Sequence, residues 1–118
     1  MKLGFGLYRH MLNDKHYRFA KQCGATHIVV HLVDYFNNKN NNKENANQPI
    51  GNTSGWGFAG DGKLWSLEFL LDLKKEINSY GLELEAIENF DPAIWHDILL
   101  DGPKKEEQIE LVKEQIRI

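Results

Sequence analysis

Residues 26–32 read Thr-His-Ile-Val-Val-His-Leu and form the most strand-like stretch of the chain. β-Branched residues dominate it, and apolar residues follow one another almost without a break. Strands that are buried on both faces of a parallel sheet have this composition, because helices cover both sides of such a sheet. The stretch therefore predicts an α/β fold built on a parallel sheet.

Two shorter apolar runs predict strands on either side of this one. Residues 3–7 read Leu-Gly-Phe-Gly-Leu, and residues 82–87 read Leu-Glu-Leu-Glu-Ala-Ile. Alternation of apolar residues with glycine or glutamate is typical of a strand, in which successive side chains point to opposite faces. Three strands starting near residues 3, 27 and 82 are therefore expected.

Amphipathic helices are predicted between these strands. Asn13 or Asp14 is a good cap for a first helix, which Gly24 would end, and Cys23 is expected in its core-facing part. A second helix is expected to start at the cap Ser66 and to end at Gly81. Its apolar side repeats at helical spacing, in the residues Leu67, Leu70, Leu73, Ile77 and Tyr80.

A last helix is expected to begin near Pro103, because proline suits a first helical turn. Its predicted inner face consists of Ile109, Val112 and Ile116. The order of elements is then βαβαβα with parallel strands. Residues 34–63, which include seven asparagines between positions 37 and 47, are expected to form one long Asn/Gly-rich loop.

Length and composition narrow the class of protein. The chain has 118 residues, of which 42% are hydrophobic and 26% charged, as in an ordinary soluble domain. No apolar run approaches the roughly 20 residues of a membrane helix, and no secretory signal is recognisable. Cys23 is the single cysteine, which excludes an internal disulfide and a multi-cysteine zinc site. A cytoplasmic protein without a membrane partner is the simplest expectation.

Charge is distributed unevenly along the chain, although the net charge is only −3. Residues 1–33 carry a net charge of +4, and residues 66–118 carry −7. The basic start would suit an anionic ligand, but a solvated surface explains it equally simply. The overall balance gives no case for a nucleic-acid partner.

Regular βα units in this order indicate a parallel sheet or a barrel. Three parallel strands leave both edges of a sheet open, and a (β/α)8 barrel needs about 250 residues. Residues 1–118 are therefore predicted to be a partial domain. It comprises the first three units of a TIM barrel, and the barrel is incomplete. A small three-layer α/β domain completed by an oligomer partner is the alternative, and the pattern alone favours neither.

Candidate functional residues follow the three predicted strands, because the loops at the carboxyl ends of parallel strands converge. Arg9 is suited to binding a carboxylate with its planar guanidinium group. His31 and Glu88 are the candidate catalytic groups, as acid or base. The candidate substrate-binding residues are Tyr8, Arg9, Asp34, Tyr35, Asn89 and Asp91.

Each candidate also has a purely structural explanation. Arg9 could form a surface ion pair, and His31 could be a satisfied core histidine. Asp34 and Asp91 could cap turns or helices. No phosphate-binding loop, CxxC or HExxH motif occurs, and no spacing of histidine and acidic residues predicts a metal site within the chain.

The same stretches resemble mannonate dehydratase, and the resemblance covers nearly the whole chain except about 37–63. The strings that carry it are Gly-Leu-Tyr-Arg-His-Met at 6–11, Gly-Ala-Thr-His-Ile-Val-Val-His-Leu-Val-Asp-Tyr-Phe at 24–36, Trp-Ser at 65–66, Gly-Leu-Glu-Leu-Glu-Ala-Ile-Glu-Asn-Phe-Asp-Pro at 81–92, Leu-Leu-Asp-Gly-Pro at 99–103 and Glu-Gln-Ile-Glu at 107–110.

The resemblance implies a TIM barrel of the xylose-isomerase-like group. It implies a hydro-lyase that dehydrates D-mannonate to 2-keto-3-deoxy-D-gluconate in glucuronate (hexuronate) catabolism, with a divalent metal, Mn²⁺ or similar. The metal ligands of that family lie on later strands, so none is expected in this segment. Some members carry paired histidines after the second strand, where this chain has Val33 and Asp34.

We therefore expect an N-terminal portion of a mannonate dehydratase that is inactive alone and belongs to a homo-oligomer. Two alternatives remain open. One is a non-catalytic fragment that associates with itself or with another protein. The other is a related sugar isomerase or epimerase of the same fold.

Overall fold

The computed structural model describes residues 1–33 and 62–118. They belong to two compact units. Of these described residues, the first unit contains Met1–Leu32 and Trp65–Asn89, and the second contains Val33, residues 62–64 and Phe90–Ile118. Most of the predicted Asn/Gly-rich loop lies outside the described residues.

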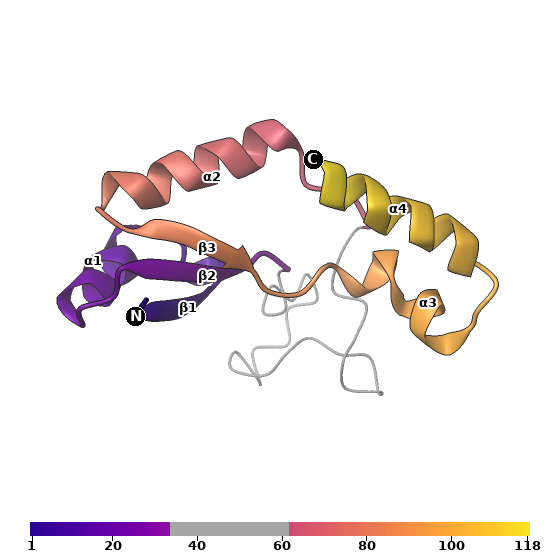
Figure 1. Cartoon of the computed structure of the whole chain (residues 1–118), viewed down its shortest axis with the longest axis horizontal. Coiled ribbons are helices and arrows are strands. Elements are labelled where there is room, and N and C mark those ends of the chain that lie inside the picture. Colours follow the sequence, from indigo (N-terminus) through magenta and orange to yellow (C-terminus); the bar gives the residue numbers. More distant parts are fainter. Residues whose placement is uncertain (34–61) are drawn as a thin grey trace, which may run out of the picture. The chain divides into compact units, whose positions relative to one another are not determined.

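The first unit contains a three-stranded parallel sheet in the order β1-β2-β3 (Figure 1). The strands are β1 (Gly4–Tyr8), β2 (His27–His31) and β3 (Glu83–Ile87). Each lies within one or two residues of the stretch predicted for it. The α/β class and the parallel strands in chain order are therefore confirmed, and they fit the first units of a TIM barrel.

Capping side chains set where the two long helices of this unit begin. Helix α1 spans Asp14–Gln22, and the amide of its third residue, His16, donates to Asn13 Oδ1 at 3.3 Å. Helix α2 spans Leu67–Ser79, and the amide of Phe69 donates to Ser66 Oγ at 3.2 Å. These side-chain oxygens satisfy amides that have no partner inside the helix, so both predicted caps are confirmed.

Two glycines end these helices. Gly24 follows α1 with a φ of +85°, and Gly81 follows α2 with a φ of +70°. Only glycine adopts this left-handed conformation without a steric penalty, so the chain can turn sharply toward the next strand at both places. The exposed thiol of Cys23 precedes the first of them, which corrects the expectation that this residue is in the core.

Both helices pack on one face of the sheet. A single hydrophobic cluster joins the two helices to the side chains of that face. Its buried members include Tyr17 and Ala20 of α1, Leu73 and Ile77 of α2, and Leu7, Ile28 and Val30 of the sheet. Parallel strands in chain order with both helices on one face are the arrangement found at the start of a (β/α)8 barrel.

The second unit contains short helices that pack on a longer one. These are the 3₁₀ helix η3 (Pro92–Ile94), α3 (His96–Leu100) and α4 (Lys105–Arg117) (Figure 1). A second 3₁₀ turn, η1 (Arg9–Met11), follows β1 in the first unit. Helix α3 was not expected from the sequence, because five residues are too few to show a helical period.

The inward face of α4 differs from the predicted one. Gln108 and Gln115 are buried, whereas Ile116 is 69% exposed. Ile109 and Val112 are only half-buried. The helix is rotated in this way because the Gln108 amide pairs with backbone groups of the preceding segments, which apolar periodicity does not reveal.

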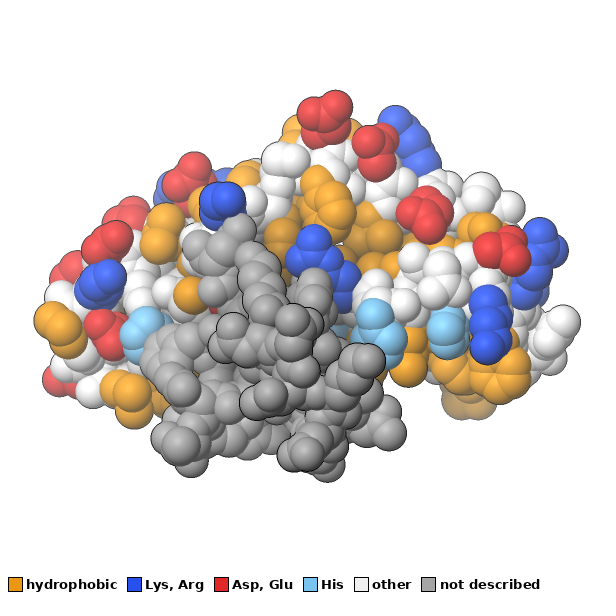
Figure 2. Space-filling view, turned by 180° about the vertical axis from the view of Figure 1, so that it is seen from behind, with side chains coloured by type: hydrophobic (Ala, Val, Ile, Leu, Met, Phe, Trp, Pro, Cys, Tyr) orange, Lys and Arg blue, Asp and Glu red, His pale blue; other side chains and the backbone are white. Residues whose placement is uncertain are grey.

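The surface of the described residues carries charges of both signs. On the face seen in Figure 2, acidic and basic side chains are interspersed among hydrophobic ones. No helix in the described part of the chain is long and apolar enough to span a membrane.

Tyr17 offers a test of the core of the first unit. Its ring lies 4.9 Å from that of Tyr80, and its hydroxyl is buried without a hydrogen-bond partner among the described residues. Burial, and the negative charge of Glu76 nearby, raise the pKa of Tyr17. Since an unsatisfied buried hydroxyl costs about 1–3 kcal/mol, we expect Tyr17→Phe to be neutral or to raise the free energy of unfolding by about 1 kcal/mol. Urea unfolding measures this.

Tyr80→Phe is the matched control. The Tyr80 hydroxyl donates to Asp14 Oδ1 at 3.1 Å, so its removal should slightly lower the free energy of unfolding. A clear loss of stability in Tyr17→Phe would show that the buried hydroxyl is hydrogen-bonded, and the prediction would be wrong.

Candidate functional site

Three side chains line up where the strands of the sheet end. Tyr8 is the last residue of β1, His31 is the last residue of β2, and Glu88 directly follows β3. His31 Nε2 lies 2.9 Å from Glu88 Oε2, and the rings of Tyr8 and His31 are 4.5 Å apart between centroids. The two predicted catalytic residues are thus in direct contact.

The contact depends on a bulge in β3. Ile28 pairs with Leu84, but Val29 pairs with Ala86, so Glu85 is an extra residue in the ladder. An extra residue moves every later side chain of its strand to the opposite face from the one that strict alternation predicts.

Without the bulge, Glu88 would point toward the hydrophobic core. With it, Ile87 packs against the core and Glu88 lies on the other face, beside His31. A backbone hydrogen bond holds this position, because the Glu88 amide donates to the Val30 carbonyl oxygen at 2.8 Å.

The His31–Glu88 pair is suited to moving protons. The His31 side chain is only 14% exposed, whereas that of Glu88 is 53% exposed. When Nε2 carries a proton, it can donate this proton in a hydrogen bond to the Glu88 carboxylate. The pair can therefore take up or release a proton at a position that is partly shielded from water, as general acid–base chemistry requires.

Arg9 and Asn89 also lie in the first unit. Arg9 Nη1 donates to the Leu32 carbonyl oxygen, but the bond is long, at 3.4 Å. Within the described part of the chain the other donors of the guanidinium group have no acceptor, and their geometry suits a carboxylate. Asn89 has a φ of +63°, a conformation that asparagine tolerates better than most residues, and it turns the chain away from β3.

Asp91 belongs to the second unit, where it is 7% exposed. Its two carboxylate oxygens accept hydrogen bonds from the amides of Gly62 and Ala93, at 3.2 and 2.9 Å. It thereby caps η3, the structural role that aspartate often has at a helix start. The remaining two candidates, Asp34 and Tyr35, lie outside the described residues.

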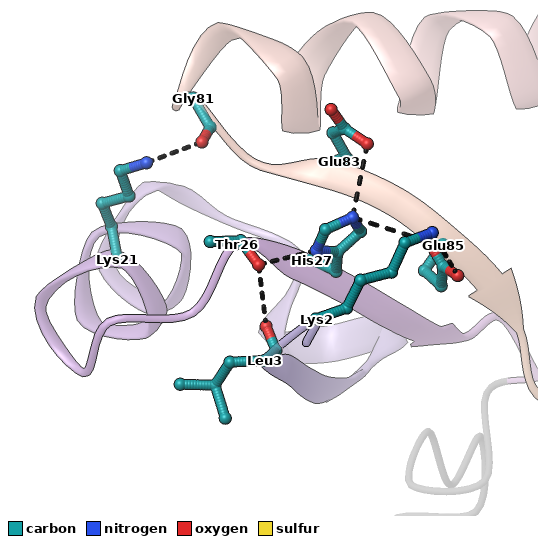
Figure 3. A network of polar contacts seen from close by, with 8 residues as sticks. All are labelled: Lys2, Leu3, Lys21, Thr26, His27, Gly81, Glu83 and Glu85. Atoms are coloured by element: carbon teal, nitrogen blue, oxygen red, sulfur yellow. Dashed lines mark hydrogen bonds and ion pairs between the residues drawn. The ribbon is translucent and has the colours of Figure 1, made fainter.

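A second polar cluster, at the amino ends of the strands, was not expected (Figure 3). His27 Nε2 lies 3.3 Å from Glu83 Oε2 and 3.6 Å from Glu85 Oε2. Lys2 Nζ donates to both carboxylate oxygens of Glu85 at 2.9 Å, and His27 Nδ1 lies 2.6 Å from Thr26 Oγ1. The glutamates that alternate in 82–87 were the only signal for this cluster in the sequence.

The Lys2–Glu85 pair shifts the titration of both residues. The hydrogen bond from Lys2 lowers the pKa of Glu85 and raises that of Lys2. A carboxylate with a lowered pKa contributes stability above its unfolded-state pKa and loses it as the pH falls. We therefore expect the free energy of unfolding to decrease between about pH 5 and pH 3, and to decrease less in Glu85→Gln. Urea unfolding across this range measures both slopes.

Salt provides the control for this prediction. The pair is exposed, so about 1 M NaCl should screen it and make the two pH profiles similar. Identical profiles of Glu85→Gln and the parent chain at low salt would contradict the prediction.

A metal site was not predicted for this chain. The described residues include no group of three or more His, Cys, Asp or Glu side chains placed to hold a metal ion. The His31–Glu88 pair provides two such groups. No metal-dependent step is therefore assigned to the described residues.

One comparison with known proteins points to a function. The chain is 41% identical over 56 residues to a mannonate dehydratase of Geobacillus thermodenitrificans. The match covers 48% of this chain and 15% of the length of that relative. No protein-family model and no solved structure matches the chain. The similarity supports, at a coarse level, a relation to enzymes of sugar metabolism.

Proposed function

We propose that this chain is part of a mannonate dehydratase, in which it supplies side chains that bind the substrate and move protons. The 56-residue similarity to a mannonate dehydratase is the observation that carries the proposal. The parallel strands and the His31–Glu88 contact at their carboxyl ends support it, because active sites of TIM barrels are built at that end.

The proposed reaction removes water from D-mannonate. A base takes the proton from the carbon beside the carboxylate, and the hydroxyl group on the next carbon leaves as water after an acid protonates it. The resulting enol tautomerises to the 2-keto acid. His31 accepts or supplies one of these protons, and Glu88 stabilises the charged ring. Arg9 binds the substrate carboxylate through two parallel hydrogen bonds.

The test is a dehydration assay on the natural gene product that contains this chain. We expect the protein to convert added D-mannonate, with Mn²⁺ in the buffer, to a 2-keto-3-deoxy acid. The concentration of the keto acid is followed over time. Conversion of aldoses to ketoses without dehydration of mannonate would overturn the proposal in favour of a sugar isomerase. Absence of turnover with both substrates would also overturn it.

A further inference from the structure

Tyr8 is the only residue of β1 whose side chain extends from the face that carries His31. In a strand, alternate residues share a face, so Gly4, Gly6 and Tyr8 lie together. They pair in register with His27, Val29 and His31. The two glycines have no side chains, and no described atom lies within 4 Å of a Cβ placed on either one. Tyr8 thus adds one aromatic ring to a face of β1 that is otherwise without side chains, directly beside His31.

The ring geometry is that of a packing contact. The Tyr8 and His31 rings have centroids 4.5 Å apart and an interplanar angle of 32°, within the range of favourable aromatic pairs. His10 stacks on the same Tyr8 ring more loosely, with centroids 6.1 Å apart. Of these two ring contacts between described residues, the one with His31 is the closer.

Two contacts together determine the orientation of the His31 ring. The Tyr8 ring lies against its face, which restricts the plane of the imidazole. The Glu88 carboxylate lies 2.9 Å from Nε2, which selects one of the two ring orientations that a half-turn about the Cβ–Cγ bond interchanges. One contact without the other would leave the ring free to turn, because the terminal torsion of a histidine side chain is broad.

We propose that Tyr8 is a positioning residue that holds the His31 ring in the orientation in which Nε2 faces Glu88. The sequence predicted a substrate-binding role for Tyr8, and the contact geometry gives it this different role. The part that the His31 ring plays in a reaction rests on the proposed function, whereas the positioning itself does not.

The first measurement is NMR of the chain with labelled histidines. The ring current of Tyr8 should displace the His31 ring protons upfield, and nuclear Overhauser contacts should connect them to the Glu88 side chain. We expect Tyr8→Phe to preserve both signals and Tyr8→Leu to lose both. His10→Ala is the control, and it should leave both signals in place because it removes only the looser stack.

The second measurement is dehydration kinetics of the natural gene product. Tyr8→Leu should lower kcat by roughly 10–100-fold with KM changed by less than about twofold, since misorientation of a reacting group affects the chemical step. Tyr8→Phe should retain the parent kcat. A rise in KM at constant kcat, or equal damage in Tyr8→Phe, would show that the hydroxyl binds substrate and would overturn the proposal.

The two measurements separate this inference from the proposed function. If the protein does not dehydrate mannonate but the NMR signals behave as expected, the proposed function is wrong and the positioning of His31 stands. If His31 and Glu88 stay in contact in Tyr8→Leu, the positioning role is wrong whatever the protein catalyses.

Discussion

Replacing Glu88 by glutamine is expected to lower kcat/KM for mannonate dehydration by roughly 10²–10⁴-fold, the usual contribution of a general acid–base group. Glutamine keeps the size of the side chain and can still accept a hydrogen bond from His31 Nε2, so the local structure should persist. It carries no negative charge, however, and therefore cannot stabilise the imidazolium or hold a proton. Initial rates of keto-acid formation measure the effect.

Glu83→Gln is the matched control for this variant. Glu83 also contacts a histidine, His27, but it lies at the amino end of β3, away from the carboxyl ends of the strands. Its replacement should leave kcat/KM within about threefold of the parent value, since it removes an exposed ion pair. Equal losses in both variants would mean that the charge stabilises the sheet and has no role in catalysis. Parent-like activity of Glu88→Gln would contradict the assigned role directly.

Gln108→Leu is expected to lower the free energy of unfolding by about 2–5 kcal/mol, because it leaves one buried and one part-buried backbone group without partners. Gln108 is 2% exposed. Its Oε1 accepts from the Asp97 amide at 2.7 Å, and its Nε2 donates to the Ala93 carbonyl oxygen at 3.1 Å. Leucine fills a similar volume and favours a helix equally well, so the loss would report the hydrogen bonds. Urea unfolding followed by circular dichroism measures it.

A leucine at the neighbouring exposed position separates this effect from that of a new apolar side chain. Glu107→Leu changes the same helix at a residue that is exposed to solvent, and should alter stability by less than about 0.5 kcal/mol. If Gln108→Leu were as stable as the parent chain, the second unit would not depend on the buried amide, and the explanation for the rotation of α4 would be wrong.

Local features of the sequence were sufficient to predict the elements of the first unit. The apolar runs at 3–7, 26–32 and 82–87 each became a strand of the sheet. Asn13 and Ser66 cap the two helices as predicted. These features act over a few residues, through backbone sterics and single hydrogen bonds, so the residues themselves reveal them.

Helix α4 shows where such local reasoning fails. Its isoleucines suggested an inner face, but the buried positions are Gln108 and Gln115. Burial of a glutamine is favourable only where partners for its amide are present, and the backbone partners of Gln108 lie in α3 and η3, which precede α4 in the chain. Periodicity of apolar residues contains no information about them.

The candidate site was predicted in part. The rule that loops converge at the carboxyl ends of parallel strands correctly grouped Tyr8, His31 and Glu88. It did not reveal their contacts, and it did not reveal that Asp91 caps a helix in the second unit.

The sequence by itself therefore determined the parallel strands, their order and the helix ends, because short-range periodicity and capping chemistry specify them. The tertiary structure alone decided that Glu88 faces His31. Strict alternation along residues 83–88 would direct the Glu88 side chain toward the core. In the pairing of β3 with β2, however, Glu85 is an extra residue, so the Glu88 side chain lies on the opposite face of the sheet. A bulge exists only between two paired strands, so one strand read alone could not show it.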